Sequence, residues 1–269
     1  MGSVLCFGGP YSNLQATKAV LDEAARLGIP PGQIVCTGDV VAYCADPAAT
    51  LDLVMASDIN CIMGNCEENL AGEAGDCGCG FEPGTACDVL SRGWFTHAAR
   101  ALTPAHRAWM AALPRRLVLT VGGRRLAVVH GSADAISRFL FASAPDAALA
   151  EQVAVTGCDG VIAGHCGLPF TRRVQGALWH NPGAIGMPAN DGTPRVWFSV
   201  LTPVDGQLRV EHRALEYDWA GAMAAMRAAE MAEDYASALG TGLWPSIDVL
   251  PAPERERCGV PIEPVSIVW

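Results

Sequence analysis

The 269-residue sequence has no uninterrupted run of about 18 apolar residues, so we expect no membrane-spanning helix and no membrane partner. It also lacks an internal repeat, because its 29 glycines and 18 prolines are spread along the chain. Basic residues are few: 18 Lys and Arg against 28 Asp and Glu give a net charge of −10. This field would repel a polyphosphate backbone, so nucleic acid is not an expected partner.

The composition is that of a globular protein, with 51% hydrophobic and 17% charged residues. The N-terminal residues lack a basic segment followed by a long apolar one, which leads us to expect a cytoplasmic protein. Eleven cysteines are many for such a chain, and their odd number excludes complete intramolecular pairing. Reduced thiols and metal ligation are the expected uses of these cysteines.

The first 65 residues alternate between short apolar runs and amphipathic stretches. Strands are predicted at 3–7, 33–36 and 59–63, with helices at 14–27 and 47–57 between them. Each predicted strand ends in a turn that contains Gly, with polar residues close behind. This pattern is typical of an open α/β sheet, whose sites form outside the carboxyl ends of its strands.

The rest of the chain predicts a Cys-rich loop insertion at 71–87, a helical stretch at 89–113 broken at Pro104, and the strands of a second sheet. We therefore expect one domain over 1–217. Residues 218–269 are predicted to form a C-terminal helix, from Trp219 to about Leu239, and a Pro-rich tail. The tail is a candidate contact between subunits of a homo-oligomer, and truncation after Gly240 is expected to leave a folded core.

Short motifs follow several predicted strands. They are Ser12-Asn13-Leu14-Gln15-Ala16, Gly38-Asp39-Val40-Val41-Ala42-Tyr43, Gly64-Asn65, Val128-Val129-His130-Gly131-Ser132, Gly164-His165 and Asn181-Pro182-Gly183. In this order, over roughly residues 3–217, they resemble the calcineurin-like metallophosphoesterases. The resemblance implies an α/β fold, a metallophosphoesterase-like four-layer α/β/β/α sandwich of two mixed sheets flanked by helices.

The resemblance also implies a metal site. Asp39 matches the family's bridging carboxylate, and Asn65, His130 and His165 match the remaining ligands of its second metal position. Carboxylate, amide and imidazole donors suit a divalent transition metal such as Fe, Zn or Mn, as one or two ions. In the family such ions polarise a phosphoryl group and activate hydroxide as the nucleophile.

The sequence departs from the family pattern at the first metal position. Gly9-Pro10-Tyr11 stands where the family has Asp-x-His, and Gly167 stands where a second His is expected, so three of four ligands are missing. The family's leaving-group His and the Asp that orients it are here Cys66 and Glu67. These two are therefore the candidate catalytic residues.

Thiolates are the candidate replacements for the missing ligands. Cys66, Cys77, Cys79 and Cys87 lie in or beside the loop that follows Asn65, although their spacing matches no standard metal motif, and buried packing is the alternative. His180, next to Asn181-Pro182-Gly183, is a further candidate ligand. Candidate substrate-binding residues are Tyr11, which replaces a ligand, and Arg138, a candidate anion clamp.

Two hypotheses follow. The first is a metal-dependent phosphoesterase-like hydrolase that acts on a small phosphate ester or nucleotide through a metal-bound hydroxide. The second is a noncatalytic metal- or thiol-responsive binding protein on the same fold, because reactive positions of the family are replaced at Tyr11, Cys66 and Gly167. A small phosphorylated molecule is the expected partner of the first.

Overall fold

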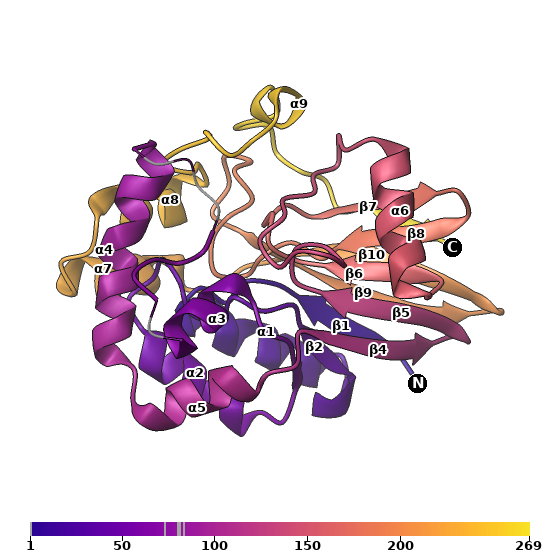
Figure 1. The fold of residues 1–269 in the computed structure, drawn as a ribbon, viewed down its shortest axis with the longest axis horizontal. Coiled ribbons are helices and arrows are strands. Elements are labelled where there is room, and N and C mark those ends of the chain that lie inside the picture. Colours follow the sequence, from indigo (N-terminus) through magenta and orange to yellow (C-terminus); the bar gives the residue numbers. More distant parts are fainter. Residues whose placement is uncertain (1, 73, 80–81, 83) are drawn as a thin grey trace.

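The computed structural model describes residues 2–72, 74–79, 82 and 84–269, and two mixed β-sheets form its centre (Figure 1). The strands of the first sheet are β1 (Val4–Phe7), β2 (Ile34–Cys36), β3 (Asn60–Cys61), β9 (Val196–Val204), β10 (Gln207–Leu215) and β11 (Ser266–Val268). Their order is β11-β10-β9-β1-β2-β3, with β1, β2 and β3 parallel and the other neighbours antiparallel.

The strands of the second sheet are β4 (Arg116–Val121), β5 (Arg124–Val129), β6 (Gly160–Ala163), β7 (Phe170–Val174) and β8 (Ala177–Asn181). They lie in the order β4-β5-β6-β8-β7. The three central strands β5, β6 and β8 are parallel, and both edge strands are antiparallel to their neighbours. Each sheet therefore has parallel strands whose carboxyl ends point to one edge, which is where α/β proteins place their sites.

Helices flank the two sheets and gather at one end of them (Figure 1). They are α1 (Leu14–Arg26), α2 (Pro47–Ala56), α3 (Asn65–Ala71), α4 (Ala86–Ala101), α5 (Pro104–Ala112), α6 (Asp146–Thr156), α7 (Trp219–Ala228), α8 (Glu233–Thr241) and α9 (Ala252–Arg255), with a short 3-10 turn at Pro31–Gln33. Within the described ranges, no helix is both long and apolar enough to cross a membrane.

The alternation of side chains along the strands produces the layers. In β1, Val4 and Cys6 pack between the two sheets, whereas Leu5 and Phe7 belong to the cluster that contains the buried faces of α1 and α2. On the second sheet, Val161 of β6 packs with α6 on the outer side. The predicted four-layer α/β/β/α sandwich is thus confirmed.

The C-terminal region differs from the single helix expected from Trp219 to Leu239. Two helices, α7 and α8, occupy it, and Glu230 between them has a positive φ of 54°, which a continuous right-handed helix does not allow. The following tail returns to the first sheet, where β11 pairs with β10. Its last residue, Trp269, is buried between the sheets.

The predicted loop at 71–87 is largely without helix or strand at its described positions, but α4 begins at Ala86, before the predicted helix start at residue 89. Thr85 caps this helix by accepting a hydrogen bond from the backbone N–H of Asp88, a local signal that the periodicity did not reveal. Residues 73, 80–81 and 83 of the loop lie outside the described residues.

Truncation after Gly240 was expected to leave the core folded, but it would remove Trp269, which is part of the core between the sheets. Its indole Nε1 donates to the Gly176 carbonyl oxygen at 3.0 Å, and the Arg124 guanidinium lies 4.8 Å from its ring centre. We predict that Trp269→Ala lowers the free energy of unfolding by roughly 3 kcal/mol, as other buried aromatic truncations do. The exposed neighbour Val268 is the control, because Val268→Ala should change it by less than about 0.5 kcal/mol. Equal urea midpoints for the two variants would contradict this role of the tail.

Candidate metal centre and its pocket

Four side chains from four strand ends meet at one point between the sheets. Asp39 follows β2, Asn65 begins α3 just after β3, His130 follows β5 and His165 follows β6. His130 Nε2 lies 3.0 Å from Asn65 Oδ1, 3.2 Å from Asp39 Oδ2 and 3.2 Å from His165 Nδ1. The four candidate ligands of the second metal position are therefore brought together.

The hydrogen bonds around His130 determine which ring nitrogen carries a proton. Its Nδ1 lies 2.7 Å from the Thr37 carbonyl oxygen, which can only accept, so Nδ1 donates and Nε2 of the neutral ring presents a lone pair. Asn65 Nδ2 donates to the Cys77 carbonyl oxygen at 2.9 Å, which turns Asn65 Oδ1 toward His130. When His130 is neutral, lone pairs of three side chains, Asp39 included, thus converge on one point. A proton on His130 Nε2 or a metal ion relieves their repulsion.

This donor set fits a divalent metal ion. Asp39, His130 and His165 form a group that could hold an ion, with ligand atoms within 4.8 Å of one another, and Asn65 Oδ1 adds an amide oxygen. Ligand atoms at about 2.0–2.2 Å from one ion lie roughly 3 Å apart, which matches the separations around His130 Nε2. The backbone acceptor behind His130 is the partner that metal-binding imidazoles usually have.

The pKa values of the group follow from the same contacts. Burial acts to raise the pKa of Asp39, but the charge and hydrogen bond of His130, the neighbouring His165 and the Cys66 backbone N–H together lower it. For His130, burial acts to lower the pKa, but Asp39, the Thr37 carbonyl oxygen and Glu67 together raise it. Burial and the neighbouring His130 lower the pKa of His165 to about 3, so His165 is neutral, as a metal ligand must be.

Glu67 holds the turn that carries Asp39, and this differs from the catalytic role expected for it. Its Oε2 accepts from the backbone N–H groups of Asp39 at 2.7 Å and Gly64 at 2.9 Å, and its Oε1 accepts from Val41 N–H at 3.2 Å. The side chain is fully buried. Glu67 is therefore a positioning residue, with its carboxylate turned to the backbone.

Gly64 allows this close packing. A Cβ added to Gly64 would lie 2.2 Å from Asp39 Oδ1 and 2.5 Å from Asp39 N, so no larger residue fits there without moving the carboxylate. Asp39 itself has a positive φ of 57°, and His165 has 61°. Both ligands thus stand on strained left-handed turns just after a strand, a feature often found at functional sites.

Cys66, the other candidate catalytic residue, lies beside the group. Its backbone N–H donates to Asp39 Oδ1 at 3.2 Å, and its side chain is buried. Burial raises the pKa of the thiol, and the carboxylates of Asp39 and Glu67 raise it further. In the absence of a metal, Cys66 is thus a protonated thiol.

The Cys-rich loop contributes differently from the thiolate ligands proposed for it. The sulfurs of Cys77 and Cys79 are bonded to each other, and within the part of the chain that the structure describes no cysteine joins the group of Asp39, His130 and His165. Cys79 Sγ accepts a hydrogen bond from Asn65 Nδ2 at 3.3 Å. The loop therefore orients Asn65, and Cys87 lines the neighbouring pocket.

Two other candidates lie away from the group. His180 has both ring nitrogens occupied by hydroxyls, since Nδ1 lies 2.8 Å from Thr171 Oγ1 and Nε2 lies 2.7 Å from Ser199 Oγ. It is thus part of a buried hydroxyl network and not a ligand of this group. Arg138 pairs with Asp134 at 3.2 Å on the surface and does not line the pocket, so its expected role as a substrate clamp is not supported.

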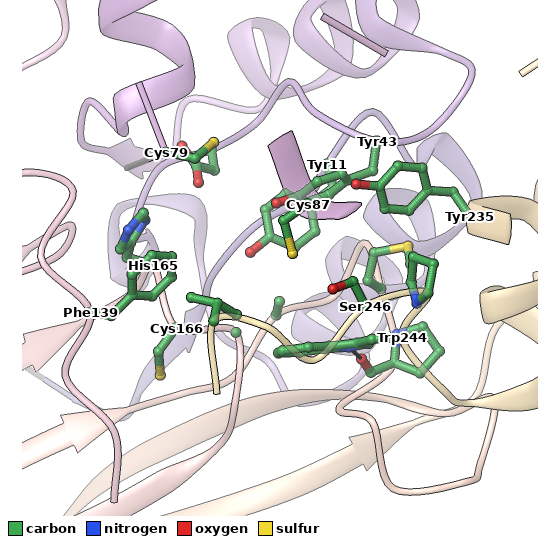
Figure 2. A pocket seen from close by; sticks show the side chains of 17 residues that line it. Tyr11, Tyr43, Cys79, Cys87, Phe139, His165, Cys166, Tyr235, Trp244 and Ser246 are labelled. Carbon is green, nitrogen blue, oxygen red and sulfur yellow. Dashed lines mark hydrogen bonds between the residues drawn. The ribbon is translucent and has the colours of Figure 1, made fainter. Parts of the chain in front are cut away.

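A pocket opens over Asp39 and His165 (Figure 2). Tyr11 lines it, as expected for a substrate-binding residue, and Phe139 stacks on His165 with ring centres 4.0 Å apart. Most of its other lining residues carry no sequence motif and were not found by sequence reasoning. They include Tyr235, Trp244, Met187 and Ser246, whereas Tyr43, which also lines the pocket, belongs to the motif that contains Asp39.

The sandwich, with Asp, Asn and His donors at its strand ends, defines a metallophosphoesterase-type domain. The family model of the calcineurin-like phosphoesterase superfamily domain matches residues 11–203. The chain belongs to this superfamily, as the motifs predicted.

Other proteins are similar to this chain in sequence or in fold. The chain is 27% identical over 228 residues to the uncharacterized protein MJ0912 of Methanocaldococcus jannaschii, with 77% of this chain and 85% of that protein covered. Among solved structures, a metallophosphoesterase from Sphaerobacter thermophilus has a TM-score of 0.70 at 23% identity, covering 90% of this chain and 99% of that one. The hypothetical protein PH1004 from Pyrococcus horikoshii has a TM-score of 0.76 at 18% identity, covering 91% and 100%. These two structures show that the fold is shared.

The contacts of Glu67 generate a prediction about metal affinity. In Glu67→Gln an amide N–H₂ replaces one acceptor and faces a backbone N–H, so the turn that holds Asp39 should shift. We expect metal binding to weaken by roughly 10- to 100-fold, as when an outer partner of a ligand is lost. Competition with a chelating dye measures it. Glu68→Gln is the matched control, because Glu68 pairs with Arg115 at the surface, and equal affinities in both variants would contradict the positioning role.

Proposed function

We propose that this protein is a metal-dependent phosphoesterase that hydrolyses a small phosphate ester at the pocket over Asp39 and His165. The observation that carries this proposal is the convergence of lone pairs from Asp39, Asn65 and His130 at the base of a pocket. Membership in the calcineurin-like phosphoesterase superfamily supports it.

A divalent ion bound by this group would polarise a phosphoryl oxygen and activate a water molecule for attack. The residues of the chain prepare that step. Thr37 keeps the Nε2 lone pair of His130 directed into the site, and Asn65 is held by the Cys77 carbonyl oxygen. Phe139 restrains the His165 ring by stacking, and the Tyr11 hydroxyl is a hydrogen-bond donor available to a phosphoryl oxygen.

A second candidate function has one observation in its favour. The bonded pair Cys77 and Cys79 contacts Asn65 directly, so a change in its redox state would reach a candidate metal ligand. This arrangement suits a noncatalytic, thiol-responsive metal-binding protein. Such a protein would bind metal and hydrolyse no ester of a broad panel.

Substitution of the ligands tests the proposal. Asp39→Asn and His130→Ala should each reduce kcat/KM for a chromogenic aryl phosphate by more than the roughly 10- to 100-fold that loss of an outer partner costs. Both should also lower the metal content of protein purified without chelator. Asp134→Asn is the control, because Asp134 is half-exposed and pairs with Arg138 outside the pocket.

Two measurements together decide between the candidates. Hydrolysis that requires added Mn, Fe or Zn and disappears in both ligand variants supports the enzyme. Bound metal without turnover on the panel supports the binding protein. Activity that is unchanged in Asp39→Asn and His130→Ala would contradict the proposed site.

A further inference from the structure

The pocket over the metal centre has walls of aromatic rings and sulfur (Figure 2). Among its described lining residues there is no Lys or Arg, and Asp39 is the one that carries a carboxylate. Phosphate-binding pockets commonly use Arg or Lys as charge partners. The charge of a bound ester must therefore be balanced almost entirely by the metal centre.

A charge count at this centre favours a singly charged ester. One divalent ion with the Asp39 carboxylate and the neutral side chains of Asn65, His130 and His165 carries one net positive charge. If Glu67, which is buried beside Asp39, is ionised, it reduces this net positive charge further. A phosphodiester has one negative charge, whereas a phosphomonoester approaches two above its second pKa of about 6. The second negative charge of a phosphomonoester would have no positive partner in this pocket, and burying an unpaired charge against apolar walls costs free energy.

Tyr11 and Gly167 replace first-position ligands of the family, and both line the pocket. Gly167 lacks a side chain, and a Cβ there would lie 3.6 Å from the Trp244 ring and 3.7 Å from the Tyr11 hydroxyl. Gly167 thus borders the space near Trp244 and Tyr11. At the family's first metal position this chain places Tyr11, which lines the pocket together with other aromatic side chains.

These rings are held in place. Trp244 Nε1 donates to the Pro188 carbonyl oxygen at 2.6 Å, and its backbone N–H donates to Asn190 Oδ1 at 2.8 Å, while the ring stays partly exposed. Tyr43 packs against Tyr235 with ring centres 5.1 Å apart. A rigid, partly exposed indole opposite tyrosines is a surface on which a planar group stacks with little loss of side-chain entropy.

We infer that the substrate is a monoanionic phosphodiester, one ester group of which carries a planar aromatic ring that binds against Trp244. This inference rests on the proposed phosphoesterase function and adds the substrate class. The ring is that of a nucleobase or of a simple aryl ester, and both share the chemistry that the pocket recognises.

Binding to the metal-loaded protein tests the charge preference without turnover. Calorimetry at about pH 8 would compare phenylphosphonate, a dianion, with its methyl ester, a monoanion. We expect the monoanion to bind at least about tenfold more tightly. Hydrolysis of bis(p-nitrophenyl) phosphate should likewise exceed that of p-nitrophenyl phosphate in kcat/KM. If a 2′,3′-cyclic nucleotide binds more tightly than methyl phenylphosphonate, the pocket recognises a nucleobase. If it binds more weakly, the pocket recognises a simple aryl ring.

Variants of the pocket test the role of the ring. Trp244→Ala should weaken binding of methyl phenylphosphonate by about 5- to 150-fold, the range that one to three kcal/mol of stacking gives. Trp244→Phe should restore part of it. Trp109→Ala is the matched control, because Trp109 on α5 is also partly buried but does not line the pocket. Ser246→Arg should shift the preference toward the dianion by adding a cation to the wall.

The outcomes separate the two proposals. Tighter binding of the dianion, or binding that Trp244→Ala leaves unchanged, would overturn the inferred substrate class even if metal-dependent hydrolysis is observed. A monoanion preference that depends on Trp244, without hydrolysis of any ester, would support the ligand class and contradict the proposed enzyme. Failure of one proposal is thus distinguishable from failure of the other.

Discussion

The hydrogen bond between His130 Nδ1 and the Thr37 carbonyl oxygen determines the chemistry of the whole centre. It fixes the tautomer of His130, so that the Nε2 lone pair points at the oxygens of Asp39 and Asn65. Without a proton on Nε2 or a metal ion, these atoms would repel one another in a buried space, where electrostatic interactions are strong. Because the bond joins the end of β2 to the residue after β5, it also connects the two sheets at the point where their strand ends meet.

Hydrogen bonds and close packing around this bond hold the other candidate ligands, Asp39 and Asn65, in place. Glu67 binds three backbone N–H groups of the neighbouring turns, and Gly64 permits the close approach of the Asp39 carboxylate. The bonded loop at Cys77 and Cys79 orients Asn65. The chain thus brings together the four candidate ligands of the family's second metal position, while Tyr11 stands at a position where the family has a ligand of the first.

The strands of the first sheet could be predicted from the sequence because short apolar runs indicate them, and the polar residues just after these runs indicate the edge where a site forms. The four-layer sandwich and the candidate ligand group were predicted only from the resemblance of the motifs to the calcineurin-like metallophosphoesterases. The roles of Glu67 and Cys79 depend on which way a side chain turns after a tight bend, and no sequence periodicity reports that. The aromatic wall could not be predicted either, since Trp244 comes from the C-terminal region and reaches the pocket only through tertiary packing.

The central claim is that Asp39, Asn65, His130 and His165 hold one divalent ion with nitrogen and oxygen donors alone. X-ray absorption on metal-loaded protein, combined with metal quantification, tests it most directly. We predict one ion per chain and a first shell of nitrogen and oxygen at about 2.0–2.2 Å. A sulfur neighbour near roughly 2.3 Å, or a second ion about 3.5–4 Å from the first, would contradict it.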